Sequence, residues 1–199
     1  MINRSRKFIF VGITKTASSS IFRFFMNNGL TEVQGKYETL ALGDLYTRQH
    51  TPIIDIEQGL PHLKFEDYYK FAFVRHPYER HKSLWKWLIK HANLKADINT
   101  FTVNALKGVY PHPMRYMPQI DWLKNSQGQI LCDFVGKVET LNEDFEKLCK
   151  VLDPALENVT LTTENAITAS EDETMLSPES KKLLADYYEQ DFLHFGYDK

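Results

Sequence analysis

The stretch "VGITKTASSS", residues 11 to 20, gathers small and hydroxyl-bearing side chains around one lysine. An apolar run precedes it and another follows, which is the order strand, loop, helix that holds phosphate groups in many proteins. Backbone N–H groups at the start of a helix point at a bound anion, and the helix dipole favours negative charge there. The stretch therefore predicts a phosphate-binding loop with these residues: Lys15, Thr16, Ala17, Ser18, Ser19 and Ser20.

This loop departs from the Walker A pattern GxxxxGK[ST], in which a lysine directly precedes the Ser or Thr. With Gly12 placed at the first glycine, Ala17 and Ser18 stand where the pattern has Gly and Lys. The lysine stands inside the loop instead, and the sequence shows no obvious Walker B acid. A nucleoside-triphosphate hydrolase is therefore disfavoured. On these residues alone, an ordinary serine-rich cap on a buried helix stays open as the alternative.

A second group suited to phosphate lies in "FAFVRHPYERHKS". Arg75 comes at the carboxyl end of a predicted strand, where ligands bind in open α/β sheets. Ser83 lies about two turns along the helix that follows. A guanidinium makes bidentate contacts with phosphate, although a salt bridge for Arg75 and a solvent-facing Ser83 are the simpler alternatives. Two phosphate sites on neighbouring strands favour a ligand with phosphates at both ends of a nucleoside.

The elements that must position these residues repeat the order strand–helix along the chain. Short apolar runs predict strands over 7–13, 69–75 and 132–138, each followed by a helical pattern, the last of which covers about 141 to 152. Ser177 caps a closing helix with Pro178 at its first position. Segments 92–118 and 157–175 are expected to be irregular. The order predicts an α/β fold, P-loop-like and three-layered, with a central parallel sheet flanked by helices.

Composition limits the classes of function. The 199 residues fit one domain, 1–199, and 43% hydrophobic with 25% charged residues is typical of soluble globular proteins. A net charge of -2 argues against a general nucleic-acid-binding surface. Cys132 and Cys149 form no CxxC pair, and no HExxH or paired-carboxylate signature is present, so no metal is expected. No segment has the length of a membrane span, which favours a cytoplasmic location, and the oligomeric state is left open.

Together, "TKTASSS" and "FAFVRHPYERHKS" resemble the two cofactor-binding motifs of sulfotransferases that use 3′-phosphoadenosine 5′-phosphosulfate. The likeness is greatest to the carbohydrate branch, Golgi-type and related bacterial enzymes, which includes heparan and uronyl 2-O-sulfotransferases and the chondroitin enzymes. It extends over most of the chain, through "RQHTPI", "MPQIDWL", "DFVGKVETLNEDFEKLCKVL" and "YYEQDFLHFGY". The resemblance implies transfer of a sulfonate to a hydroxyl acceptor, expected to be a carbohydrate, with adenosine 3′,5′-bisphosphate as the product.

The resemblance also implies roles for individual residues. Residues 15 to 20 would hold the 5′-phosphosulfate, with Lys15 at the bridging oxygen and the transferring sulfonate. Arg75 and Ser83 would hold the 3′-phosphate. His50, within "RQHTPI", would be the catalytic base, a task that suits the near-neutral pKa of histidine.

Other residues compete for the role of base or could contact the acceptor. His76, directly after Arg75, is the rival by position, and Asp44 or Asp55 could serve as a carboxylate base. Five cations are candidate contacts for an anionic acceptor, although lysine and arginine are usually solvated surface residues. They are Lys36, Arg48, Arg80, Lys82 and Arg115.

Two alternative functions follow from the same motifs. A small-molecule kinase with a degenerate phosphate loop would bind ATP with magnesium rather than adenosine 3′,5′-bisphosphate. A non-catalytic nucleotide-binding protein would keep the fold, and substitutions of His50 or Lys15 would change no rate.

Overall fold

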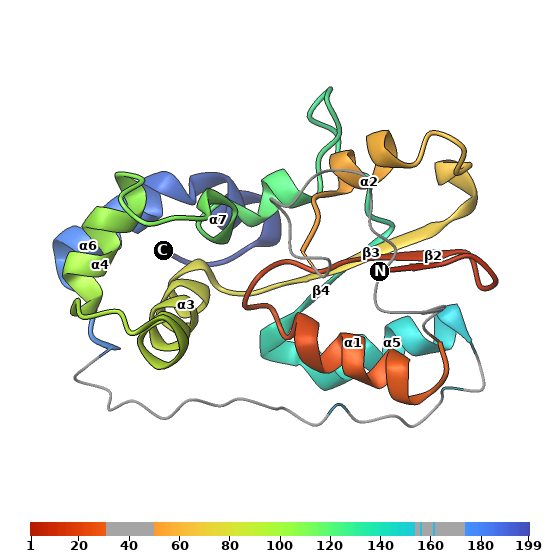
Figure 1. Ribbon diagram of the computed structural model, residues 1–199, viewed down its shortest axis with the longest axis horizontal. Helices are drawn as coiled ribbons and strands as arrows, with labels where there is room; N and C mark the ends of the chain where they lie inside the picture. Colours follow the sequence, from red (N-terminus) through yellow and green to blue (C-terminus); the bar gives the residue numbers. More distant parts are fainter. Residues whose placement is uncertain (31–49, 154–155, 157–160, 162–173) are drawn as a thin grey trace. The chain divides into compact units, whose positions relative to one another are not determined.

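The computed structural model describes residues 1–30, 50–153, 156, 161 and 174–199 (Figure 1). The chain divides into two compact units. Unit 1 comprises Met1–Val74 and Asp121–Glu164, and unit 2 comprises Arg75–Ile120 and Asn165–Lys199.

Unit 1 is built on a four-stranded sheet with the strand order β1-β2-β3-β4. Its strands are β1 (Ile2–Asn3), β2 (Phe8–Val11), β3 (Tyr69–Val74) and β4 (Phe134–Lys137). Strands β2, β3 and β4 are parallel, with Val11 opposite Ala72 and Val74 opposite Lys137. The predicted parallel sheet is thus confirmed. Strand β1 was not predicted; it pairs antiparallel with β2 at the edge.

Helices cover both faces of this sheet, as the α/β prediction requires. Helices α1 (Ser18–Asn27) and α5 (Leu141–Leu152) lie against one face, and α2 (Ile53–Gly59) lies on the other (Figure 1). Two short 3-10 segments, η1 (Phe65–Asp67) and η4 (Val138–Thr140), also belong to unit 1, and η3 (Gln119–Trp122) spans the division between the units. Strands β2 and β3 are buried on both faces, as central strands of such a fold are.

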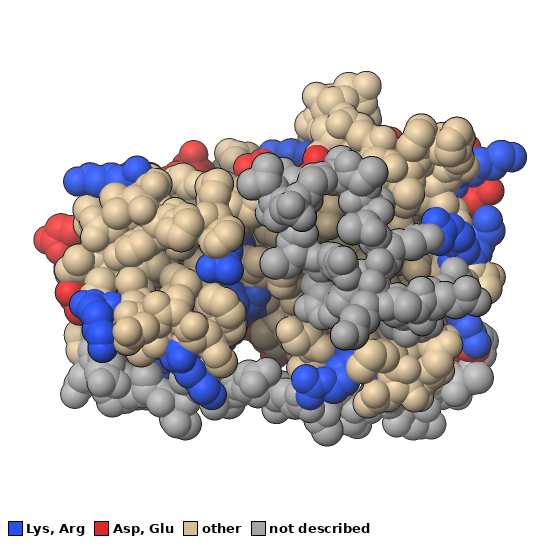
Figure 2. Space-filling model, viewed as in Figure 1, with Lys and Arg blue, Asp and Glu red and all other residues tan. Residues whose placement is uncertain are grey.

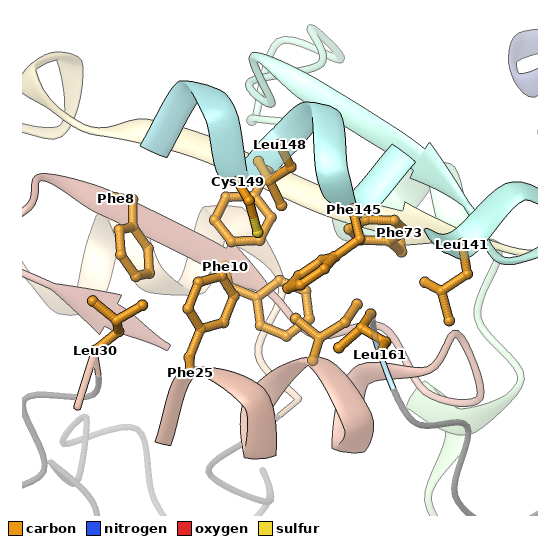
Figure 3. Packing of buried hydrophobic residues seen from close by; sticks show 12 residues of the cluster. Phe8, Phe10, Phe25, Leu30, Phe73, Leu141, Phe145, Leu148, Cys149 and Leu161 are labelled. Carbon is orange, nitrogen blue, oxygen red and sulfur yellow. The ribbon is translucent and has the colours of Figure 1, made fainter. Parts of the chain in front are cut away.

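The core between the sheet and helices α1 and α5 is largely aromatic (Figure 3). Phe10 of β2 stacks on Phe71 of β3, with 5.2 Å between the ring centroids. Phe145 of α5 meets Phe24 of α1 edge-on at 4.9 Å. Side chains alternate along a strand, so Ile9 is directed to the opposite face of the sheet. This packing fixes the carboxyl end of β2, from which the predicted phosphate loop departs.

Unit 2 is helical in the part that the structure describes. It contains α3 (Pro77–Ala92), α4 (Ile98–Leu106), the 3-10 segment η2 (Pro113–Arg115), α6 (Pro178–Tyr187) and α7 (Glu189–Phe195). Its core joins Leu84 and Leu88 of α3 with Phe101 of α4, Leu184 of α6 and Phe192 of α7. Pro77 stands at the start of α3, where the fixed φ of proline suits the first helical position.

Two expectations for unit 2 are corrected. Segment 92–118 was expected to be irregular, yet it contains α4, which Asp97 caps by accepting from the backbone N–H groups of Asn99 and Thr100. The closing helix is two helices, α6 and α7, which meet at Tyr188. The Ser177 cap is confirmed, since its hydroxyl accepts from the Ser180 N–H. Most of segment 157–175 lies outside the described residues.

His81 of α3 predicts a pH dependence of stability. Its Nε2 lies 2.9 Å from Thr102 Oγ1, which itself donates to the Ile98 carbonyl, so His81 Nε2 is the donor. Its buried Nδ1 finds no partner among the described residues, and burial lowers its pKa to about 3 from an ordinary value of 6.5. Below pH about 6.5 the unfolded chain takes up a proton that the folded chain does not. The free energy of unfolding should therefore decrease from pH 7.5 to pH 5.

The comparison variant is His81→Phe, which keeps a ring at this site. In urea unfolding, the difference in free energy between pH 7.5 and pH 5 should be smaller for this variant than for the wild type. An equal difference in both proteins would assign the pH dependence to other groups.

Candidate functional site

The loop that joins β2 to α1 has an unusual backbone. Lys15 and Ala17 both adopt left-handed conformations, with φ of 67° and 59°. Such conformations in a turn direct successive backbone N–H groups to one side and form anion-binding concavities. Thr16, between them, is fully buried, and its hydroxyl donates to the Ile13 carbonyl at 3.1 Å. The Thr16 hydroxyl hydrogen is therefore used to hold the loop together.

The start of α1 bears on the alternative of an ordinary serine cap. The N-cap residue is Ala17, whose methyl side chain cannot accept a hydrogen bond from the first N–H groups of the helix. The serines follow it: Ser18 is buried and Ser19 exposed, with Ser20 between these extremes. A helix start without a capping side chain suits a site where a bound anion supplies the acceptor atoms. The residues present therefore fit a phosphate or sulfonate group.

The strain in this loop leads to a prediction. A left-handed residue other than glycine costs roughly 1–2 kcal/mol, so Ala17→Gly should raise the free energy of unfolding by about 0.5–1 kcal/mol. Ala17→Val should lower it by about 1–2 kcal/mol, because a β-branched residue fits this region poorly. Urea unfolding without ligand measures both values.

The matched control is Ala105→Gly in α4. There the backbone is helical, and glycine should lower the free energy of unfolding by about 1 kcal/mol or more. If glycine changed the free energy of unfolding in the same direction at both positions, the result would contradict the strain assigned to Ala17.

His50 lies beside the beginning of the loop. Its Nδ1 is 2.6 Å from the carbonyl oxygen of Gly12, the residue after β2. A carbonyl only accepts, so Nδ1 carries the hydrogen and Nε2 of a neutral ring carries the lone pair. The edge of the buried Trp122 ring also faces His50, with 6.4 Å between the centroids. The structure thus holds this histidine at the start of the loop that was predicted to bind phosphate, in the tautomer that can take a proton at Nε2.

The rival bases differ in their surroundings. His76 Nδ1 accepts from the Tyr78 N–H at 3.3 Å, and its Nε2 lies 3.0 Å from the Asp198 carbonyl, so Nε2 donates there. Both nitrogens of His76 are therefore engaged in holding the start of α3. Asp55 lies on α2, and burial raises its pKa. Asp44 lies outside the described residues.

Unit 2 carries the second predicted group. Arg75 is the residue directly after β3, and Ser83 is half-buried on α3. The backbone N–H and the backbone carbonyl of Arg75 both form hydrogen bonds with one side chain, that of Gln119. Its N–H donates to Gln119 Oε1 at 2.9 Å, and its carbonyl accepts from Gln119 Nε2 at 2.8 Å. No local pattern of residues predicts this contact, because its partners are 44 residues apart.

The cations proposed for the acceptor have different environments. Arg80 is only 3% exposed, and its guanidinium donates to the carbonyls of Met117 and Arg115. The expectation that Arg80 contacts an acceptor is wrong, because it is an internal structural residue. Lys82 pairs with Glu79 at 2.8 Å, and the Arg115 guanidinium stands 5.0 Å from the centroid of the Trp87 ring. Lys36 and Arg48 lie outside the described residues.

Metal-dependent chemistry and cysteine-based chemistry have little support in the described part of the chain. There, no group of three or more His, Cys, Asp or Glu side chains is placed to hold a metal ion. Burial raises the pKa of both free thiols, Cys132 and Cys149, to about 12, which makes them poor nucleophiles. On the face of each unit seen in Figure 2, lysine and arginine side chains stand in small separate groups. None of the described helices is long and apolar enough to cross a membrane.

The protein therefore has an α/β fold with a mostly parallel sheet, in which β2 leads into the predicted phosphate loop and then into α1. A family model described as the sulfotransferase family matches residues 1–198, and the chain belongs to this family. No curated protein and no solved structure matches the chain. The family predicted from the two motifs is thereby confirmed. Its members transfer a sulfonyl group to a hydroxyl acceptor, in general from 3′-phosphoadenosine 5′-phosphosulfate.

Proposed function

We propose that this protein transfers the sulfonate of 3′-phosphoadenosine 5′-phosphosulfate to a carbohydrate hydroxyl, with His50 as the catalytic base. The observation that carries the proposal is the contact between His50 Nδ1 and the Gly12 carbonyl, 2.6 Å apart. In this contact Nδ1 donates, so Nε2 of the neutral ring carries the lone pair, and the ring lies beside the residue at which the proposed anion-binding loop begins. The carbohydrate acceptor rests on the resemblance of the motifs to the carbohydrate branch.

The proposed cofactor roles follow the two motifs. The loop, residues 15 to 20, binds the 5′-phosphosulfate through the N–H groups at the start of α1 and through the charge of Lys15. Arg75 and Ser83 bind the 3′-phosphate, since a guanidinium and a hydroxyl suit a terminal phosphate. The family match over residues 1–198 includes both motifs and supports one sulfotransferase domain made of the two units.

The reaction is an in-line displacement at sulfur. His50 Nε2 accepts the proton of the acceptor hydroxyl, while the ring is kept in place by its Nδ1–H bond to Gly12. The acceptor oxygen forms a bond to sulfur as the bond from sulfur to the bridging oxygen breaks. Lys15 neutralises the negative charge that develops on that oxygen. When bound, the cofactor supplies the activated sulfonate and a stable leaving group, adenosine 3′,5′-bisphosphate.

Two measurements test this proposal. Calorimetry should show binding of adenosine 3′,5′-bisphosphate and much weaker binding of ATP with magnesium. Labelled cofactor incubated with a panel of saccharide, lipid and peptide hydroxyls should label a saccharide. Tight binding of ATP without binding of the bisphosphate would support the kinase instead. Binding of the bisphosphate without transfer to any acceptor would leave a nucleotide-binding protein.

A further inference from the structure

We propose that Gln119 and Asp191 are positioning residues that orient Arg75 for the 3′-phosphate of the cofactor. This inference rests on the proposed function, because it takes Arg75 as a phosphate ligand. It adds two residues, remote from Arg75 in sequence, that act on the ligand only through Arg75.

Arg75 lies between the end of β3 and the start of α3. Strand β3 ends at Val74 and α3 begins at Pro77, so neither a sheet ladder nor a helix fixes the backbone between them. Gln119 fills this role with its side-chain amide. It accepts from the Arg75 N–H at 2.9 Å and donates to the Arg75 carbonyl at 2.8 Å, as a neighbouring strand would. Two bonds to one residue restrict its backbone, and they therefore fix the direction in which its side chain leaves the chain.

Asp191 of α7 holds Gln119 in turn. Its Oδ2 accepts from the Gln119 N–H at 2.8 Å and from Gln119 Nε2 at 3.3 Å. Its Oδ1 accepts from the Ile120 N–H at 2.8 Å. Gln119 and Asp191 are both fully buried, so these bonds form away from water. Because Asp191 takes one hydrogen of the Gln119 amide, the amide cannot turn over, and its oxygen must face the Arg75 N–H.

Further buried groups hold the segment that carries Gln119. The Arg80 guanidinium donates to the carbonyls of Met117 and Arg115. The Tyr188 hydroxyl donates to the Tyr116 carbonyl at 2.8 Å. Each bond satisfies a main-chain carbonyl with a side chain of unit 2, since Arg80 lies on α3 and Tyr188 lies between α6 and α7. The backbone from residue 115 to residue 120 is therefore fixed from several helices, which suits a support for a ligand-binding arginine.

The test compares two ligands that differ at the 3′ position. Gln119→Met keeps the length of the side chain and removes both bonds to Arg75. It should weaken binding of adenosine 3′,5′-bisphosphate by between about 10-fold and 100-fold. Binding of adenosine 5′-phosphosulfate, which has no 3′-phosphate, should change less than about threefold. Calorimetry gives both dissociation constants, and thermal unfolding gives the stability of each variant.

Several controls separate positioning from a merely structural role. Thr102→Val removes a buried polar group of unit 2 that does not touch Arg75, and it should lower the melting temperature without changing the ratio of the two affinities. In an Arg75→Ala background, Gln119→Met should weaken bisphosphate binding no further. An unchanged ratio in Gln119→Met, or full additivity with Arg75→Ala, would overturn the inference.

A second variant keeps the test usable if Gln119→Met does not fold. Gln119→Glu retains the shape but places a second oxygen against the Arg75 carbonyl and Asp191. Relative to the wild type at the same pH, its bisphosphate affinity should recover as the pH is lowered, because a protonated Glu can donate as Gln does. No recovery would contradict the proposed role of the Nε2 donor. A wild-type protein that does not bind the bisphosphate would instead overturn the proposed function.

Discussion

His50→Asn should lower kcat for sulfonyl transfer by about 10²- to 10⁴-fold, the usual contribution of a general base. Asparagine is chosen because its amide N–H can replace His50 Nδ1 as the donor to the Gly12 carbonyl, so the loop keeps its contact. What the variant lacks is the lone pair at Nε2. Binding of adenosine 3′,5′-bisphosphate should therefore be nearly unchanged. Steady-state rates with labelled cofactor, together with calorimetry, measure both quantities.

The matched control is His76→Asn in the other unit. Both nitrogens of His76 are engaged in hydrogen bonds at the start of α3, so its loss should affect stability more than rate. The pH–rate profile gives a further check, since the fall in rate at low pH should disappear with the base. A rate for His50→Asn within about threefold of the wild type, with a large loss in Asp55→Asn, would transfer the role of base to the carboxylate.

Lys15→Met should lower kcat by about 10²- to 10³-fold, the range found when one group that stabilises developing charge is removed. Methionine retains much of the length of the side chain and removes only the charge. The loss should be larger in kcat than in the affinity for the bisphosphate product, because the charge on the leaving oxygen develops fully only as the bond to sulfur breaks.

The control for Lys15→Met is Lys90→Met on the exposed face of α3, which should leave kcat unchanged. If Lys15→Met instead raised KM with kcat intact, Lys15 would contribute to binding in the ground state alone.

Features determined by neighbouring residues were predicted well from the sequence. Helix α5 has the bounds expected from its apolar spacing, and Ser177 and Pro178 begin α6 as predicted. Strand β1 was not predicted, because its two residues are too few to show the alternation of side chains that indicates a strand. Helix α4 was missed although Asp97 is an ordinary helix cap, because the prolines after it favoured a loop.

The candidate site shows a similar division. The loop and the two motifs were recognisable from residue types in short stretches. A serine-rich cap was left open as an alternative, but the N-cap is Ala17, which adopts a left-handed conformation directly before the serines. The roles of Gln119 and Asp191 could not be predicted, since their bonds join residues 44 to 72 positions apart. Hydrogen bonds between residues so far apart in the sequence form only when the helices of unit 2 are packed together.

The bond from Asp191 to Gln119 also bears on how the protein is made. A ribosome releases the chain from its amino end, at about 5–20 residues per second. Gln119 emerges 72 residues before the carboxylate that holds it. During that interval, of several seconds, Gln119 lacks the carboxylate that orients its amide. A nascent chain should therefore acquire affinity for the bisphosphate only when residue 191 has left the exit tunnel, which stalled chains of increasing length would reveal as a single late step.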